Sequence, residues 1–354
     1  MNLLDNKHVL ITGGTGSLGQ VLLRRILTGE QGRPRKITIF SRDESKQHDM
    51  HMEYLNRLAT TDEAVYELYR QTVAFRIGDV RDYHGVTAVM RDADILFNAA
   101  ALKHVPACEY SPFEAVKTNI LGPENIIRAI REHNLPVQTV IGISTDKACK
   151  PVNVMGMTKA IQERLFVQAN LECPQTRLVC VRYGNVLASR GSVIPLFHKI
   201  IRNGGPITIT TPEMTRFLLS LNQAVDTVFA ALNEAHPGEI YVPRVPSARV
   251  VDVAAILVGN RSIETKIIGI RPGEKIHEIL VSEEEAHRTA ARGAYFVIMP
   301  SQAELRHADW AGIPLDKEYS SADHLMSAQD VRGMLAQYNL LDVEKGIPQD
   351  RLLL

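Results

Sequence analysis

The 354-residue sequence has no long apolar run and no excess of charge of one sign. No apolar stretch approaches the roughly 18 residues that a transmembrane helix needs, so we expect a soluble chain without a membrane partner. Forty basic and forty acidic residues give a net charge of zero, which removes the electrostatic argument for binding nucleic acid. Any anionic ligand must therefore be met by local cations.

The sequence is also poor in cysteine and shows no export signal. Its four cysteines, at positions 108, 149, 173 and 180, match neither a zinc-ligand spacing nor a disulfide framework, so we expect reduced thiols and no metal site. The N-terminus, MNLLDNKHVLITGG, lacks the basic region, apolar stretch and cleavage site of a secretory signal. We therefore expect a cytoplasmic protein.

Apolar β-branched runs alternate with segments of helical period through the first half of the chain. Such alternation predicts an α/β fold of Rossmann type, which is a doubly wound parallel sheet with helices on both faces. The strands are predicted at Lys7–Thr12, Lys36–Phe40, Thr72–Ile77, Asp94–Asn98, Val137–Ser144 and Arg177–Arg182. The long stretch Asp43–Arg70 should be helical because its apolar residues have helical spacing.

The pattern changes after Tyr183, where short strand-like pieces at Ile207–Thr210 and Glu239–Val242 are separated by proline and glycine. We predict a dinucleotide-binding domain over 1–185 and a smaller, interleaved substrate-binding lobe over 186–220 and 237–300. Residues 221–236 should form a helix that packs back on the first sheet, because it is too apolar to stand alone. The tail, 301–354, has one readable helix, which opens at Ser327 and runs to about Tyr338.

Glycines at positions 13, 16 and 19 follow the first predicted strand and lead into an apolar helical run. Glycine is needed where the backbone turns sharply and approaches a pyrophosphate at a helix N-terminus. An ordinary glycine-rich turn is the alternative, but the position between a strand and a helix favours a dinucleotide. The expected contacts are Gly13, Thr15, Gly16, Ser17, Leu18 and Gly19.

The end of the second strand selects between NAD and NADP. It carries Ser41, Arg42 and Asp43 at the place where an acidic residue for the ribose indicates NAD. Because an arginine there pairs with the 2′-phosphate of NADP, we expect NADP, although Asp43 could still bind a ribose hydroxyl of NAD. The other expected cofactor contacts are Lys46, Asp79, Val80, Ala99, Ala100 and Ala101. Tight helix-sheet packing is an alternative role for the alanines.

The fifth strand ends in STDK, residues 144–147, and Lys159 follows twelve residues later. A hydroxyl, an acid and a lysine at a strand's carboxyl end lie where ligands bind in doubly wound sheets. A phenol one turn before Lys159 would complete the usual short-chain dehydrogenase group, but that position is Met155. Methionine cannot transfer a proton there, so a substrate hydroxyl must lose its proton by another route. A helix N-cap beside surface lysines is the structural alternative.

The sequence resembles the extended short-chain dehydrogenase/reductases, and within them the soluble nucleotide-sugar 4,6-dehydratases that act on UDP-N-acetylglucosamine in bacterial surface-glycan pathways. The matching stretches are GGTGSLG, IFSRDE, GDVRD, AALKHVPACEYSPFEAVKTNILG, STDKA, RYGNVLASRGSVIPLF, MTRFLLSL and IRPGEKIHEIL, from residue 7 to about 300. Many members have tyrosine where this chain has Met155, and a subset has methionine. The resemblance also implies a homo-oligomer, from a dimer to a hexamer.

The resemblance implies a lyase that oxidises C4 of the sugar with NADP, eliminates water across C5 and C6 and returns the hydride to C6. Asp146 would be the acid at the C6 hydroxyl, and Lys147 the base at C5, with a pKa lowered by nearby Lys159 and partial burial. Thr145 would bond O4, and Lys159 would bind the nicotinamide ribose. The O4 proton could reach solvent through Lys147, Thr145 or an ordered water.

A UDP-sugar carries two phosphates, for which a neutral protein must supply nearby cations. The candidates are Arg190, Arg216 and Arg271, each of which could instead form a surface salt bridge. Further substrate contacts are expected at Lys103, Asn185, Ser192, Val193, Pro195, Leu196 and Glu274. We leave out His104 and His277, because a lone histidine is more often structural.

Three other functions fit the same fold. A UDP-sugar 4-epimerase needs no base at C5, so the pair Asp146 and Lys147 disfavours it. A 5,6-dehydratase would stop before the hydride returns. A non-catalytic NADP-binding protein would explain Met155 as a mark of lost activity, but not the presence of Asp146, Lys147 and Lys159 together.

Overall fold

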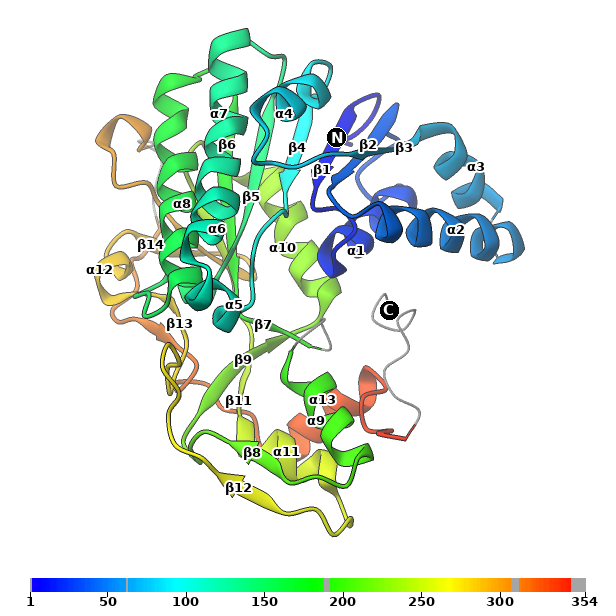
Figure 1. The fold of residues 1–354 in the computed structure, drawn as a ribbon. Helices are drawn as coiled ribbons and strands as arrows, with labels where there is room; N and C mark the ends of the chain where they lie inside the picture. The colour runs from blue at the N-terminus through cyan, green and yellow to red at the C-terminus, as the bar shows by residue number, and fades with distance from the viewer. Residues whose placement is uncertain (1, 62, 188–191, 307–311, 345–354) are drawn as a thin grey trace.

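The computed structural model describes residues 2–61, 63–187, 192–306 and 312–344. Its largest part is a nine-stranded sheet in the order β14-β15-β10-β6-β5-β4-β1-β2-β3 (Figure 1). The first six strands are β1 (His8–Thr12), β2 (Lys36–Ser41), β3 (Val73–Ile77), β4 (Ile95–Asn98), β5 (Thr139–Thr145) and β6 (Arg177–Tyr183). They pair in parallel, and each boundary lies within two residues of its prediction, which confirms the doubly wound α/β fold.

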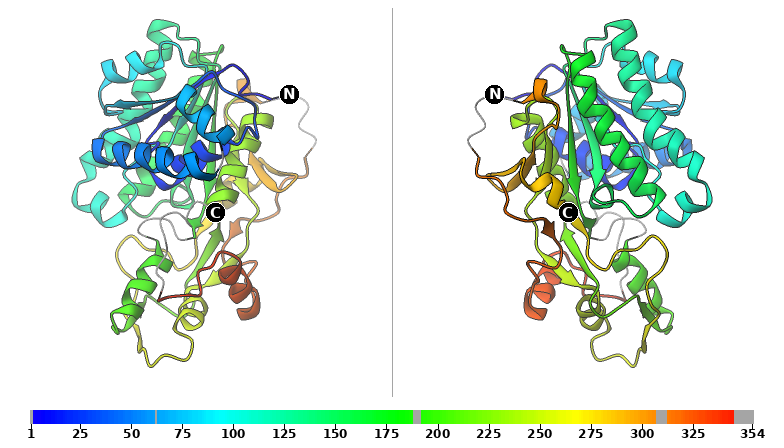
Figure 2. Two further views of the ribbon diagram at one scale, coloured as in Figure 1. Left: turned by 90° about the vertical axis from the view of Figure 1, so that its right-hand side faces the viewer. Right: turned by 90° about the vertical axis from the view of Figure 1, so that its left-hand side faces the viewer.

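Helices cover both faces of this sheet (Figures 1 and 2). One face carries α4 (Tyr83–Met90), α7 (Gly122–His133) and α8 (Val154–Glu172), and the other carries α1 (Ser17–Leu27) and α10 (Leu221–Glu234). The predicted helical stretch after β2 forms α2 (Glu44–Thr61) and α3 (Glu63–Thr72). The connection from β4 to α7 contains α5 (Val105–Tyr110), α6 (Pro112–Val116) and the π-helical turn η1 (Lys117–Leu121).

The helix α10 belongs to the core of the main sheet although it comes late in the chain. Ser220 begins it with a capping box, in which its hydroxyl accepts from the Gln223 backbone and the Gln223 side chain accepts from the Ser220 backbone. Its buried apolar residues, among them Val225 and Val228, lie in the same hydrophobic core as β5 and β6. The apolar face of this helix is therefore covered by the sheet.

One strand lies elsewhere than the sequence pattern indicated. We expected Glu239–Val242 in the substrate-binding lobe, but β10 (Ile240–Pro243) pairs in parallel with β6 in the main sheet. β15 (Tyr295–Ile298) and β14 (Thr289–Arg292) extend that edge in antiparallel order. All residues of β10 are buried, and a strand without a solvent face suits the interior of a large sheet. The predicted domain boundaries at 185 and 300 stay a prediction.

A second hydrophobic core lies between α9 (Val193–Arg202), α11 (Val250–Val258) and α13 (Ala328–Gln337), below the main sheet in Figure 1. The short elements around it and between the two cores are β7 (Asn185–Val186), β8 (Ile207–Ile209), β9 (Thr215–Leu219), β11 (Ser247–Arg249), β12 (Thr265–Ile267), β13 (Ile279–Val281), α12 (Glu283–Ala286), η3 (Ala303–Leu305) and β16 (Tyr319–Ser320). Ser327 caps α13, and Val331 and Leu335 are fully buried in this core, so α13 of the tail is part of the fold.

Two further facts bear on the expectations drawn from composition. Cys108, Cys149, Cys173 and Cys180 are all buried free thiols. Within the described ranges, no helix is both long enough and apolar enough to cross a bilayer.

Candidate active site

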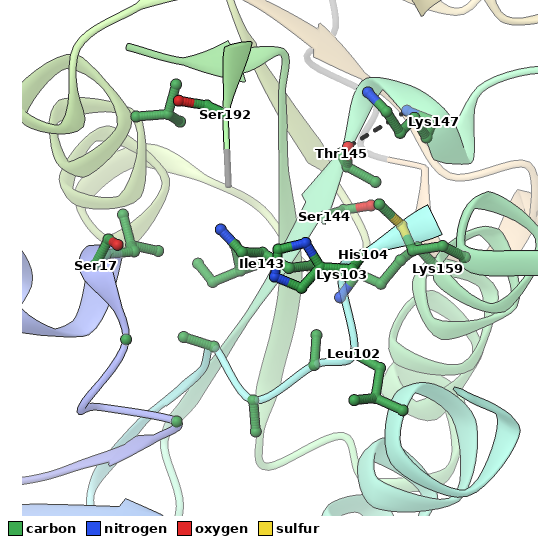
Figure 3. Close-up of a pocket in the computed structure, with 18 of the residues that line it drawn as sticks. Ser17, Leu102, Lys103, His104, Ile143, Ser144, Thr145, Lys147, Lys159 and Ser192 are labelled. Carbon is green, nitrogen blue, oxygen red and sulfur yellow. Dashed lines mark hydrogen bonds between the residues drawn. The ribbon is translucent and has the colours of Figure 1, made fainter. Parts of the chain in front are cut away.

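A cavity of about 660 Å³ opens at the carboxyl ends of β1, β4 and β5 (Figure 3). It is lined by the phosphate turn 13–19, the loop 99–107 after β4, the end of β5 and the first turns of α8. Gly184, Asn185 and Ser192 line it from the segment that leads to the second core. A crevice at this end of the strands is where a doubly wound sheet binds its ligand.

The phosphate turn fits a dinucleotide by its shape. Gly13 has a φ of +66°, and a Cβ there would lie 2.7 Å from the Cα of Ala100. The turn and the loop after β4 therefore approach closely only because position 13 is glycine. Gly16 precedes α1 and supplies no side-chain cap, so it leaves the amides of the first helical turn, which are the groups that bind a pyrophosphate, to other partners.

A second cavity of about 240 Å³ adjoins the first, and both are lined by Gly13, Thr15, Lys46, Ala100 and Ala101. Its other walls include the predicted cofactor residues Ser41, Arg42, Asp43, Asp79 and Val80. Arg42 Nη1 lies 3.6 Å from Asp79 Oδ2, and Lys46 Nζ lies 2.7 Å from Asp43 Oδ2. The two cavities share part of their walls, and two cations, Arg42 and Lys46, line the smaller one, where they could meet a phosphate.

Asn119, in the π-helical turn η1, fixes the loop between the two cavities. Its Oδ1 accepts from the backbone N–H of Leu102, and its Nδ2 donates to the Leu102 carbonyl and to Thr158 Oγ1. The sequence analysis missed Asn119, because it acts on backbone seventeen residues away and no motif spacing marks it.

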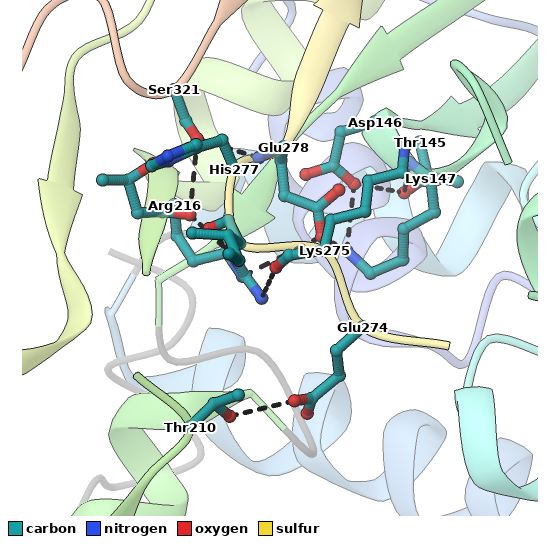
Figure 4. Close-up of polar contacts among 12 residues, drawn as sticks. Thr145, Asp146, Lys147, Thr210, Arg216, Glu274, Lys275, His277, Glu278 and Ser321 are labelled. Atoms are coloured by element: carbon teal, nitrogen blue, oxygen red, sulfur yellow. Dashed lines mark hydrogen bonds and ion pairs between the residues drawn. The ribbon is translucent and has the colours of Figure 1, made fainter. Parts of the chain in front are cut away.

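The end of β5 turns sharply into η2 (Asp146–Ala148), with the Thr145 hydroxyl accepting from the Lys147 backbone. A Cβ at Gly156 would lie 2.1 Å from the Lys147 carbonyl oxygen, so α8 packs directly on this turn. Asp146 Oδ1 accepts from Thr145 Oγ1 at 2.9 Å and from Lys147 Nζ at 3.1 Å (Figure 4). The structure thus brings the predicted hydroxyl, acid and lysine together at the cavity wall.

The charges around Lys147 correct one expectation. Burial alone would lower the pKa of Lys147, but the carboxylates of Asp146 and Glu278 outweigh burial and raise that pKa. The sequence analysis expected the pKa of Lys147 to be lowered, with Lys159 as a cause, and this is wrong. Burial also raises the pKa of Asp146, with Lys147 acting in the opposite direction, and a raised pKa is the direction that a general acid needs.

The lowered pKa belongs to Lys159, which burial brings to about 8. Its Nζ donates to Gln162 Oε1 at 2.5 Å, and Gln162 Nε2 donates to the carbonyl of Ile143 at 3.1 Å. Lys159 and Met155 both line the larger cavity. The amine therefore stands where a nicotinamide ribose is expected, with a thioether in place of the phenol.

The predicted substrate residues divide into two groups. Lys103, Asn185 and Ser192 line the larger cavity, and Asn185 Oδ1 and Ser192 Oγ are buried with no hydrogen-bond partner among the described residues. The residues Val193, Pro195, Leu196, Arg216, Arg271 and Glu274 line neither cavity. Arg190 lies outside the described residues. The two buried polar atoms are the stronger candidates for ligand contacts, because a buried polar group without a partner is costly.

Arg216 is committed elsewhere. Its guanidinium donates to the backbone carbonyls of Thr215, Lys275 and Ile276, which holds it at the junction of the two cores. Glu274, expected at a uridine ribose, accepts from Thr210 Oγ1 at 2.9 Å. A diphosphate would have to displace the backbone contacts of Arg216, and a ribose hydroxyl would have to displace Thr210 from Glu274.

The two histidines that the sequence analysis left out lie in different surroundings. His104 lines the larger cavity beside Lys103 (Figure 3). His277 instead shares a hydrogen bond with Thr215 Oγ1 at 2.8 Å, which fits a structural role.

Comparisons with known proteins place these observations in a family. The family model described as "Polysaccharide biosynthesis protein" matches residues 9–300. A UDP-N-acetylglucosamine 4,6-dehydratase (inverting) of Campylobacter jejuni is 44% identical over 302 residues, which are 84% of each chain. A protein of Rickettsia bellii named UDP-glucose 4-epimerase is 41% identical over 350 residues, 96% of this chain and 98% of its own.

One solved structure is similar to this chain over almost its whole length. The X-ray structure of Pen from Bacillus thuringiensis superposes with a TM-score of 0.84 and 33% identity, covering 95% of this chain and 99% of that chain. The resemblance seen in the sequence is therefore confirmed at the level of the family and the fold.

Proposed function

The chain belongs to the polysaccharide biosynthesis protein family, and from this premise we propose that it dehydrates UDP-N-acetylglucosamine to a UDP-4-keto-6-deoxy-N-acetylhexosamine with NADP as a recycled cofactor. The observation that carries the proposal is the meeting of Thr145, Asp146 and Lys147 at the wall of a cavity whose other end is the phosphate turn. An acid and a base side by side are what an elimination needs.

A nicotinamide dinucleotide bound along the two cavities would supply the acceptance of hydride from C4 and its return to C6. Once C4 is a ketone, the C5 proton is acidic. Lys147 takes this proton when its amine is neutral, which its raised pKa makes the less common form, while Asp146 protonates the departing C6 hydroxyl. Lys147 returns a proton to C5 when C6 receives the hydride. The proton released from O4 in the oxidation leaves to solvent, and a solvent proton restores Asp146 after the elimination, so the net change is the loss of one water.

Thr145 offers a route for the O4 proton that does not need a phenol. Its hydroxyl donates to Asp146 Oδ1 at 2.9 Å. The O4 proton leaves during the oxidation, before Asp146 has lost its own proton, so Thr145 passes it on to solvent, and the same hydroxyl returns a solvent proton to Asp146 after water has left. This relay gives a role to the hydroxyl next to Asp146 and is compatible with a thioether at Met155.

The proposal is tested by incubating the purified protein with NADP and UDP-N-acetylglucosamine and analysing the product by mass spectrometry and NMR. We expect a sugar lighter by one water, with a ketone at C4 and a methyl group at C6. Retention of a C5–C6 double bond would indicate a 5,6-dehydratase, and no turnover with tight cofactor binding would indicate a non-catalytic protein. Either result would overturn the proposal.

A UDP-sugar 4-epimerase is the second candidate, because a relative with that name matches 96% of this chain. An epimerase returns the hydride to C4, so its product has the mass of the substrate and the opposite configuration at C4. The buried acid and the lysine beside it have no task in that reaction, which is why we place dehydration first.

The preference for NADP is tested at Arg42. Its guanidinium is half exposed at the smaller cavity and lies 3.6 Å from Asp79, so it can turn to a 2′-phosphate. We expect Arg42→Ala to weaken NADP binding by about 10-fold to 100-fold, because the 2′-phosphate loses a charged hydrogen-bond partner. Binding of NAD, which has no 2′-phosphate, should be nearly unchanged. Isothermal titration calorimetry with both cofactors measures this.

The matched control is Arg33→Ala, an exposed arginine just before β2 that lines neither cavity. Equal affinities of the parent protein for NAD and NADP would contradict the preference. The expected homo-oligomer is a further proposal that sedimentation of the same samples addresses.

A further inference from the structure

Glu278 is a buried carboxylate that the sequence analysis did not single out. It immediately precedes β13 and is only 2% exposed. Its backbone is fixed by Ser321, whose Oγ accepts from the Glu278 N–H at 2.9 Å and whose N–H donates to the Glu278 carbonyl at 2.8 Å. The side chain is thus held from a part of the chain far from β5.

The side chain of Glu278 meets the end of β5 at Lys147. Lys147 Nζ lies 3.2 Å from Glu278 Oε1 and 3.1 Å from Asp146 Oδ1, so the amine bridges two carboxyl groups (Figure 4). Lys147 and Asp146 line the larger cavity, whereas Glu278 does not. Glu278 therefore contacts Lys147 on the side of the amine away from the cavity lining, where we do not expect a bound sugar to reach it.

Two other cations face this carboxylate, and both are engaged with backbone. Arg216 Nε lies 3.9 Å from Glu278 Oε1, with its other nitrogens on backbone carbonyls. Lys275 donates to the carbonyl of Cys149 at 2.5 Å. Although burial opposes its charge, these cations and Lys147 lower the pKa of Glu278. Glu278 is accordingly an anion.

One oxygen of each carboxyl group has no partner. Asp146 Oδ2 and Glu278 Oε2 are both buried without a hydrogen bond among the described residues. A structural ion pair would be expected to use these oxygens, since leaving a buried polar atom unpaired is costly. Each carboxyl group thus contacts Lys147 through one oxygen, and its other oxygen makes no competing hydrogen bond among the described residues.

We propose that Glu278 is a positioning residue for the dehydration: its carboxylate holds Lys147 at the cavity wall and is the counter-charge of the ammonium that forms when Lys147 takes the C5 proton. This inference rests on the proposed function. In the elimination, the proton leaves C5 for Lys147 Nζ, and the Asp146 proton leaves with the C6 hydroxyl as water. Glu278 exchanges no proton with the sugar.

The test is the pH dependence of kcat for dehydration in Glu278→Gln, which keeps the size of the side chain and removes its charge. Glu278 raises the pKa of both Asp146 and Lys147, so removing its charge lowers both. The acid must be protonated and the base neutral, so each limb of the pH profile depends on one of these groups. We therefore expect the whole profile to move to lower pH by about one unit.

At neutral pH, kcat of Glu278→Gln should fall by about 10-fold or more, because Lys147 loses one of its two anchors, while KM for the nucleotide sugar changes less than about threefold. Glu278→Asp shortens the side chain by one methylene and so places the carboxylate further from Lys147. We expect this variant to move the pH profile in the same direction as Glu278→Gln, but by a smaller amount. The matched control is Glu283→Gln, an exposed glutamate five residues further on, which should leave the profile unchanged.

If folded Glu278→Gln or Glu278→Asp has a lower kcat but the pH profile of the parent, the inference is overturned. The inference is also overturned if Glu283→Gln moves the pH profile as far as Glu278→Gln does. The parent protein separates this outcome from failure of the proposed function. If the parent releases no water from UDP-N-acetylglucosamine, the proposed function is wrong. If the parent is active and Glu278→Gln keeps its pH optimum, only the role of Glu278 is wrong.

Discussion

Lys147→Ala is expected to lower kcat for the loss of water by about 10³-fold or more, since positioned proton transfer contributes roughly 10²–10⁴-fold and no other amine is paired with Asp146 in the described residues. Single-turnover assays with mass detection of the sugar measure this. Because the nicotinamide step precedes loss of the C5 proton, the variant should still reduce its bound cofactor, which absorbance records. Turnover close to that of the parent would remove Lys147 from the mechanism.

The control for Lys147 is Lys150→Ala, three residues further on, where the amine pairs with Glu318 at the surface. Alanine at 147 also leaves two buried carboxyl groups without their shared cation, which would destabilise the fold. The double variant Lys147→Met/Glu278→Gln removes the cation together with the Glu278 carboxylate and leaves only Asp146, whose raised pKa makes its neutral form easier to reach. It should unfold closer to the parent temperature and remain inactive, which separates loss of the base from loss of structure.

Asp146→Asn is expected to lower kcat by about 10²-fold to 10⁴-fold with little change in cofactor binding. The amide has the shape of the carboxyl group, but it cannot give an acidic proton to the departing C6 hydroxyl. We expect hydride to be taken from C4 and the reduced cofactor to accumulate, because water leaves too slowly for the hydride to return. Stopped-flow absorbance and product analysis follow the two steps separately.

The control for Asp146 is Asp316→Asn, an exposed aspartate between β15 and β16. Product formation by Asp146→Asn at the rate of the control would show that the C6 hydroxyl obtains its proton from another group.

The first half of the fold could be predicted because all of its strands except the edge strand β3 are mostly buried apolar runs, and helical segments lie between them in the sequence. This local signal is complete within about 30 residues. The place of β10 could not be predicted in the same way. Its short apolar run between proline and glycine shows that it is buried, but which sheet buries it depends on β6, about 60 residues earlier.

The candidate site shows the same division. The glycines of the phosphate turn and the sequence STDK at 144–147 are local motifs whose spacing indicates their function, so they could be identified from the sequence. The pKa of Lys147 was predicted in the wrong direction because Glu278, which opposes the effect of burial, is about 130 residues away in the chain. A glutamate inside IRPGEKIHEIL has no local feature that marks it as the partner of a lysine on another element.

The position of β10 has a consequence for synthesis of the chain. β6 is finished by residue 183, but the strand that pairs with its outer edge begins at residue 240. While the intervening residues leave the ribosome, an almost wholly buried apolar strand has unpaired N–H and C=O groups along one side. During that interval, the open edge of β6 in the nascent chain can pair with a strand of another chain. This edge is covered once Ile240–Pro243 has paired with β6.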